Sequence, residues 1–139
     1  MEQQENRVVL RGTVAEEATL SHQVHGIAFY RFPLAVPRLS GREDRLNILC
    51  PHTAPEDPLP QAGSFVEVRG EVRSFNNRSG VGNRLVITVL ARELLPSAEE
   101  PCNQVVLGGV LCNPPVLRRT PLGRDICDLL LAVNRRYRR

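Results

Sequence analysis

The sequence predicts an all-β fold, with a five-stranded antiparallel barrel followed by an incomplete second copy of the same unit. Helical periodicity is scarce, whereas short alternating or β-branched runs recur along the chain. Turn-forming clusters rich in Gly, Pro and Asn separate these runs. In addition, a segment near the end repeats the beginning at a constant offset of 97 residues. These three observations favour a small barrel and a partial repeat of it.

Five runs predict the strands of the first barrel. The stretch "SHQVHG" is predicted to turn between the first two strands, and "NNRSGVGN" to form the hairpin loop between the last two. The connection over residues 51–63 holds four prolines, which forbid a long helix there. Gly12 and Gly70 suit the sharp bends of a small barrel. In order, the predicted strands are residues 7–14, 27–37, 44–50, 64–75 and 84–94.

The internal repeat sets the domain organisation. Shifted by 97 residues, "NRVVLRGTV" lies over "NQVVLGGVL", Gly26 over Gly123, and "LAV" at 34–36 over "LAV" at 131–133. The second copy covers only the first two strands, which form a hairpin. We therefore expect a barrel at 1–95, a linker at 96–102 and a partial second unit at 103–139.

The repeat also predicts which side chains face inward. Tyr30, Phe32, Leu34 and Val36 superpose on Cys127, Leu129, Leu131 and Val133, and this register is taken as the inward one in both copies. In the second copy the opposite face is also largely apolar. A strand that is apolar on both faces requires cover on both sides. The second hairpin is thus expected to dock on the first barrel or to pair with the same hairpin of another chain.

Charge is unevenly distributed along the chain. All 18 basic residues are arginine, and residues 103–139 hold seven of them against two aspartates, a net charge of +5. No run approaches the roughly 18 apolar residues of a membrane span, and the start "MEQQENR" is acidic rather than signal-like. We therefore expect a cytoplasmic protein without membrane partners. The four cysteines, at positions 50, 102, 112 and 127, are expected to be reduced.

The sequence gives little support for an enzyme, a cofactor or a metal site. It has no Gly-rich phosphate loop, no His-Glu metal motif and no nucleophile with a placed base. His22 and His25 could converge with Cys50 and His52, but their spacing fits no standard zinc finger. We expect these histidines to be exposed or satisfied by hydrogen bonds. Catalytic and metal-ligating residues are therefore predicted to be absent.

The repeat unit resembles the opening of the bacterial single-stranded DNA-binding proteins. The shared pattern comprises Asn103, Val-x-Leu-x-Gly-x-Leu at 105–111, a Pro-x-Val turn at 114–116, Thr-Pro-x-Gly at 120–123, and Leu-Ala at 131–132. The first copy matches more weakly but has the five-strand length of that fold, and its reduced helix is similar to primosomal replication protein N. The resemblance implies an oligonucleotide-binding (OB) fold that holds single-stranded DNA, usually as an oligomer. In that fold the site is formed by the face of strands 2 and 3, together with the loop between strands 1 and 2 and the loop between strands 4 and 5.

Single-strand binding requires cations that follow the phosphates and flat side chains on which bases stack, each stack contributing about 1–3 kcal/mol. The predicted hairpins place arginines on either side of one groove, and Tyr137 lies among arginines at the end of the chain. The predicted DNA-binding residues are Arg31, Arg38, Arg42, Arg45, Arg73, Phe75, Arg78, Arg84, Arg118, Arg119, Arg124, Arg135, Arg136 and Tyr137.

The expected function is largely sequence-independent binding of single-stranded DNA in replication, repair or recombination. The protein is expected to be a homo-oligomer, a dimer or higher, assembled through residues 103–139. An alternative stays open. The chain would then be an OB-fold module that assembles proteins of the replication machinery through its apolar second hairpin, without strong DNA binding, and the arginines would serve solubility.

Overall fold

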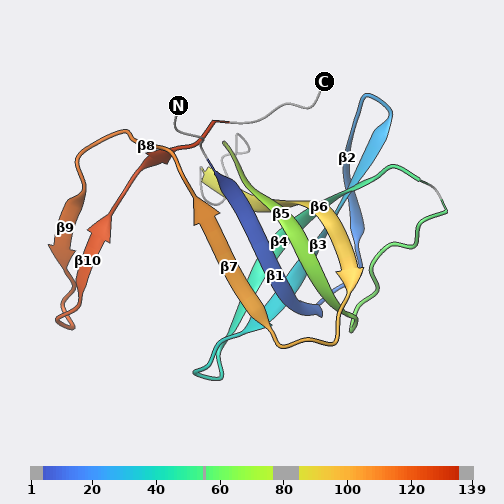
Figure 1. The fold of residues 1–139 in the computed structure, drawn as a ribbon, viewed down its shortest axis with the longest axis horizontal. Coiled ribbons are helices and arrows are strands. Elements are labelled where there is room, and N and C mark those ends of the chain that lie inside the picture. Colours follow the sequence, from blue (N-terminus) through green and yellow to red (C-terminus); the bar gives the residue numbers. More distant parts are fainter. Residues whose placement is uncertain (1–4, 55, 77–84, 135–139) are drawn as a thin grey trace. The chain divides into compact units, whose positions relative to one another are not determined.

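The computed structural model describes residues 5–54, 56–76 and 85–134, and every regular element within these ranges is a β-strand (Figure 1). The prediction of an all-β fold is confirmed. In chain order the strands are β1 (Asn6–Val14), β2 (Thr19–Val24), β3 (Ile27–Pro37), β4 (Glu43–His52), β5 (Phe65–Asn76), β6 (Leu85–Pro96), β7 (Cys102–Leu107), β8 (Val110–Leu111), β9 (Val116–Arg119), β10 (Asp125–Asp128) and β11 (Leu131–Ala132).

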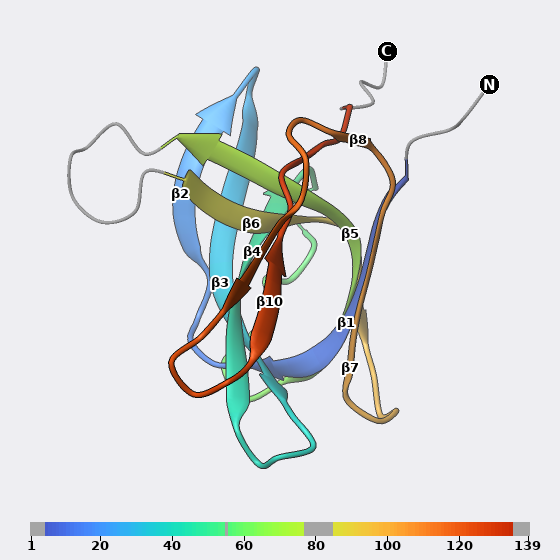
Figure 2. The same ribbon diagram turned by 90° about the vertical axis from the view of Figure 1, so that its left-hand side faces the viewer.

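Five strands, β1, β3, β4, β5 and β6, close into a barrel (Figure 2). The sheet order is β2-β3-β4-β6-β5-β1-β7, and an additional pairing of β1 with β3, at Thr13↔Ala35 and Val14↔Leu34, joins the ends of the five-stranded part. Of the barrel pairings, β4 with β6 is parallel, where an antiparallel barrel was expected. Because β5 lies between these two strands in the chain, two reversals bring β6 back to the direction of β4.

The barrel interior is apolar. Phe32 is 2 % exposed and Leu34 is fully buried, and Val36 lies with them on the inner face of β3, as the repeat predicted. Tyr30, the fourth residue of that register, is only half-buried. The remaining core side chains come from the other barrel strands, namely Val8, Leu10, Val14, Ile48, Val66, Val68, Val89 and Ala91.

Strand β2 was not predicted, because its residues were interpreted as part of a turn. The reversal is confined to His25 and Gly26, with φ of 50° and 79°. Two successive residues with positive φ make the tight turn that matches the twist of a β-hairpin. All side chains of β2 are exposed, so the strand has no apolar alternation. Its pairing with β3 stabilises it instead.

The 97-residue repeat recurs in the strand pairing. Thr13↔Ala35 and Val14↔Leu34 in the barrel become Val110↔Ala132 and Leu111↔Leu131 between β8 and β11. The backbone approaches equally closely in both copies. A Cβ added to Gly12 would lie 2.4 Å from the carbonyl oxygen of Ala35, and one added to Gly109 would lie 2.2 Å from that of Ala132. Only glycine permits such a crossing.

The hairpins of the two copies also correspond. Leu20↔Tyr30 between β2 and β3 becomes Leu117↔Cys127 between β9 and β10. Beyond this pair the copies differ, because β2 has a bulge between Leu20 and His22 that shifts its register. The β9–β10 hairpin keeps its register and closes through a wider turn, in which the Thr120 amide donates to the Arg124 carbonyl.

The chain divides into two compact units. One is Arg7–Val105 and contains the whole barrel core, and the other contains the described residues from Val106 onward. In the second unit the side chains of β9 are exposed, as are Leu129 and Leu130. Residues 125–133, which were expected to find cover, are therefore largely exposed on both faces in the single chain.

Candidate nucleic-acid interface

The outward face of β3 and β4 gathers arginine and aromatic side chains. Alternate residues of β3 point away from the core, which places Phe29 and Arg31 on this face. The register sets Arg31 opposite Leu49, Phe29 opposite Pro51, and Ala35 opposite Arg45. Arg31 and Arg45 are exposed. We call this surface, with the hairpin at residues 38–42 and the adjoining β2, the β3–β4 face.

A stacked pair of rings lies on this face. The bulge in β2 brings His22 opposite Phe29, and the two rings are parallel within 4° with centroids 4.8 Å apart. The Ser21 hydroxyl lies 2.9 Å from Nδ1 of His22 and holds the imidazole from the side. Sequence reasoning missed this pair because β2 was not recognised. The alternation of β3, which puts Phe29 on the same face as Arg31, was the available signal.

The hairpin between β3 and β4 carries two arginines with different surroundings. Arg38 donates from Nε to both carboxylate oxygens of Asp44, at 3.0 and 2.9 Å. This hydrogen bonding lowers the pKa of Asp44 and raises that of Arg38. Arg42 is exposed, and neither it nor Arg31 forms an ion pair with another described residue. Arg45 lies 3.8 Å from Glu43, and both side chains are exposed.

The hairpin of β5 and β6 supplies less than was expected. Arg73 is directed at Glu71, with its side chain 14 % exposed, so it is not placed as a free phosphate contact. Its Nε and the hydroxyl of its cross-strand neighbour Thr88 are buried without a hydrogen-bond partner in the described chain. Phe75 is 52 % exposed on β5 and is available for stacking. Arg78 and Arg84 lie outside the described residues.

In the β9–β10 hairpin, Arg118 and Arg119 form ion pairs. Arg118 donates to Asp128 at 2.7 Å, and Arg119 donates to Asp125 at 3.2 Å across the strands. The bond to Asp128 raises the pKa of Arg118. Arg124, in the turn, is exposed and forms no ion pair within the described ranges. The remaining predicted site residues, Arg135, Arg136 and Tyr137, lie outside those ranges.

A buried carboxylate organises the opposite part of the barrel, around β1 and β5. Glu67 is 8 % exposed and accepts hydrogen bonds from Arg11 and Arg69, both at 2.9 Å. These two bonds hold its pKa below the usual range of a glutamate. Arg11 also contacts Glu99 at 3.3 Å and donates from Nε to the Glu100 carbonyl. The segment at 96–102, predicted as a linker, is therefore fastened to the barrel by charge-assisted contacts.

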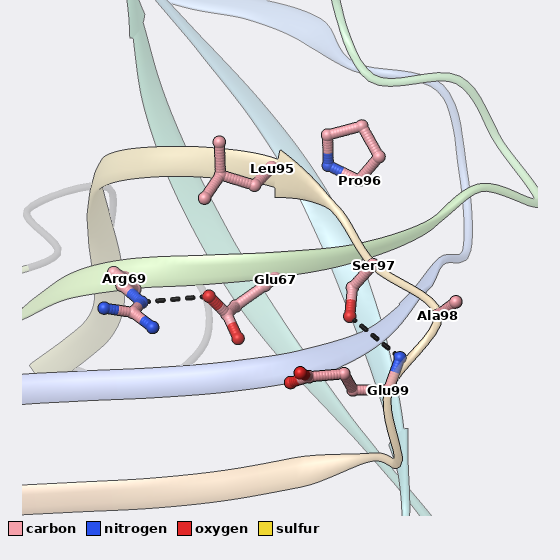
Figure 3. Close-up of a pocket in the computed structure, with 7 residues that line it drawn as sticks. All are labelled: Glu67, Arg69, Leu95, Pro96, Ser97, Ala98 and Glu99. Atoms are coloured by element: carbon pink, nitrogen blue, oxygen red, sulfur yellow. Dashed lines mark hydrogen bonds and ion pairs between the residues drawn. The ribbon is translucent and has the colours of Figure 1, made fainter.

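A shallow pocket of about 340 Å³ opens beside this cluster (Figure 3). In Figure 3 Arg69 points toward Glu67, and the Ser97 hydroxyl accepts from the Glu99 amide. The apolar part of the lining is formed by Leu95, Pro96 and Ala98. Because Glu67 already receives two guanidinium groups, the charges of this pocket neutralise one another. It therefore lacks the open positive charge that attracts a polyanion.

Acidification is expected to destabilise the barrel through these carboxylates. Burial raises the pKa of Glu71, but hydrogen bonds from Arg92 and Arg73 outweigh it, so its pKa, like those of Glu67 and Asp44, lies below the ordinary value. The unfolded chain then binds more protons near pH 4. The stability from these pairs is present above about pH 4.3 and is lost as the pH falls through the lower folded pKa values.

Urea unfolding midpoints measured from pH 7 to pH 2.5 check this expectation. The midpoint should hold near neutral pH and fall steadily below about pH 4.3. Glu67→Gln, which keeps the shape of the side chain but cannot ionise, should show a smaller fall. A midpoint that is independent of pH in the wild type would contradict the role given to these pairs.

Within the ranges that the structure describes, no three His, Cys, Asp or Glu side chains gather to hold a metal ion. His52 instead hydrogen-bonds the Asp57 carbonyl at 2.8 Å and meets Tyr30 edge-on. Burial raises the pKa of the Cys50 thiol, which makes it a poor nucleophile. The described chain also contains no helix of the length and apolarity needed to cross a membrane.

Comparison with known proteins gives matches at the level of structure. No protein-family model matches the sequence, and no curated protein proves significantly similar in sequence. The N-terminal domain of PriB from Thermoanaerobacter tencongensis, described as dimeric, is 35% identical over 68% of this chain and 98% of its own, with a TM-score of 0.57.

Two further structures match nearly the whole chain. The wild-type single-stranded DNA-binding protein of Thermus aquaticus is 25% identical, with a TM-score of 0.75 over 96% of this chain and 70% of its own. A deletion mutant of the same protein is 26% identical, with a TM-score of 0.75, over 96% of this chain and 71% of its own. These matches confirm the resemblance inferred from the sequence motifs. The chain therefore belongs to the OB-fold family of bacterial single-stranded DNA-binding proteins, with a clear likeness to PriB.

Proposed function

We propose that the chain binds single-stranded DNA with little sequence preference and acts in DNA replication, repair or recombination. The observation that carries the proposal is the β3–β4 face, where exposed Arg31, Arg42 and Arg45 accompany a stacked pair of rings. Guanidinium groups that no carboxylate holds tightly are available for phosphates, and flat rings are available for bases. Arg31 and Arg42 are such groups, and Arg45 is held only loosely.

The comparisons support the same function. The similar Thermus aquaticus structures are single-stranded DNA-binding proteins by name. Fold likeness alone does not fix a function. The proposal therefore stands on the likeness together with the chemistry of the face, because phosphate contacts and stacking are the two interactions that sequence-independent binding needs.

Titration of a labelled dT30 oligomer, followed by fluorescence anisotropy at several salt concentrations, tests this function. The affinity for dT30 should exceed that for a duplex of equal length, and log K should fall linearly with log salt. Three phosphate contacts on the β3–β4 face correspond to a slope of about −2, from about 0.7 per contact on single strands. Equal affinity for duplex, or an affinity independent of salt, would refute the proposed mechanism.

A second candidate function is protein assembly. Exposed apolar side chains in the second unit favour it, among them Leu117 at 73 % and Leu122 at 92 % exposure. Exposed apolar surface of this kind commonly marks an interaction site. The dT30 titration separates the two functions. Absence of binding at low salt would favour assembly, whereas tight, salt-dependent binding would favour DNA.

We also propose that residues 1–95 form one OB barrel, that 96–102 connect it onward, and that 103–139 are a partial second OB unit through which copies of the protein associate. The repeated strand register supports this division, and the exposed apolar hairpin supports association. Sedimentation equilibrium of the full chain tests the association. A dimer or larger species that dissociates in Leu117→Asp supports association through residues 103–139, and a wild-type monomer at micromolar concentration refutes that association.

A further inference from the structure

Resting on the proposed function, we infer that the His22–Phe29 stack with Arg31 is the subsite where one nucleotide base stacks, and that the repeated hairpin β9–β10 has lost this subsite. The first part of the argument is the geometry of the rings. Phe29 is half-buried and covers one face of the imidazole, with the planes 4° apart. Because His22 is exposed, the imidazole face turned away from Phe29 is the one available to a base.

The imidazole is also held in place before any ligand binds. Phe29 fixes the plane of the ring at a centroid distance of 4.8 Å, and the Ser21 hydroxyl lies within hydrogen-bond distance of Nδ1. A ring that is already ordered loses less side-chain entropy when a base stacks on it. Base–aromatic stacking tolerates any base, because every base has a π-face. The pair therefore suits a ligand of single-stranded nucleic acid without a fixed sequence.

A cation lies next to the rings on the same face. Arg31 follows Phe29 by two residues on β3, a separation of about 6.6 Å along the strand. Arg31 is exposed and forms no ion pair within the described chain, so its guanidinium is free for a phosphate. A single DNA strand can thus stack one base on His22 and place a phosphate on Arg31 at the same time.

The second copy of the repeat has different residues at the positions of His22, Phe29 and Arg31. The 97-residue offset puts Arg119 at the position of His22, Ile126 at that of Phe29, and Asp128 at that of Arg31. Asp128 accepts a hydrogen bond from Arg118 and would repel a phosphate. The β9–β10 hairpin lacks the bulge of β2, so Arg118 rather than Arg119 lies opposite Ile126. It therefore carries neither the ring pair nor an arginine at the position of Arg31. The two copies have separate tasks, with base contact assigned to the first.

Full-length variants titrated with dT30 test the inference. Phe29→Ala and His22→Ala should each weaken binding on the order of 10-fold or more, since one stacking contact is removed. The slope of log K against log salt should stay unchanged, because no phosphate contact is lost. His22→Phe keeps a flat ring and should bind within about 2-fold of the wild type if stacking rather than charge is the contribution. The matched control Ile126→Ala, at the equivalent position of the second copy, should also bind within about 2-fold.

The design separates this inference from the proposed function. If the wild type fails to bind dT30, the proposed function fails. If the wild type binds dT30 but His22→Ala and Phe29→Ala bind equally well, only the base-stacking subsite is refuted. A loss in Ile126→Ala equal to that in Phe29→Ala would refute the difference between the copies. Because His22 is exposed, His22→Ala keeps the test decisive even if Phe29→Ala unfolds.

Discussion

Replacing both Arg31 and Arg45 by alanine is expected to weaken dT30 binding on the order of 100-fold. Both side chains lie exposed on the outward face of β3 and β4, and a charge-assisted hydrogen bond to phosphate contributes about 1.5 kcal/mol. Loss of two phosphate contacts should also make the salt dependence shallower by about 1.4 in the log–log slope. Anisotropy titrations of the double variant at four salt concentrations measure both quantities.

Arg69→Ala combined with Arg92→Ala is the charge-matched control. It removes the same two positive charges, but these arginines serve Glu67 and Glu71, and each carboxylate keeps a second arginine partner. The control should bind dT30 within about 3-fold of the wild type, a change expected from net charge alone. Equal losses in the two double variants would mean that overall charge, rather than the β3–β4 face, governs binding.

Phe32→Ala is expected to lower the free energy of unfolding by about 3–5 kcal/mol. The side chain is 2 % exposed and packs in the barrel core with Leu34 and Ile48, so its removal leaves a cavity as well as losing buried apolar area. The loss is a large fraction of the 5–15 kcal/mol typical of a domain. Guanidinium unfolding followed by far-UV circular dichroism measures it.

Phe75→Ala makes the same chemical change at a side chain that is 52 % exposed. It should cost less than about 1 kcal/mol, because surface substitutions have small effects. Similar losses for the two phenylalanines would show that the inward register assigned to β3 is wrong.

Much of the fold could be predicted because β-strand alternation is a local signal. The alternation of β3 correctly placed Phe32, Leu34 and Val36 in the core. The exposed strand β2 could not be predicted in that way, because its six side chains show no alternation and its stability depends on pairing with β3. The β2–β3 hairpin turns at His25 and Gly26, whereas the dipeptides that strongly predict such turns are Asn-Gly and Asp-Gly.

The chemistry of the arginines was harder to predict than their positions. Whether an arginine is free depends on which carboxylate the register sets beside it, as for Arg38 with Asp44. One signal was available, because Glu71 precedes Arg73 by two residues, and residues two apart share a face of a strand. The His22–Phe29 stack could not be foreseen without β2, since the bulge in that strand brings His22 opposite Phe29.

The claim that single-stranded DNA crosses the β3–β4 face is tested most directly by ¹⁵N NMR of the full chain titrated with a short dT oligomer. The largest amide shift changes should lie on β2, β3, β4 and the hairpin at residues 38–42, including His22, Phe29 and Arg31, with small changes on β9 and β10 and around Glu67. Shift changes confined to β9 and β10, or spread evenly over the chain, would contradict this placement of the DNA.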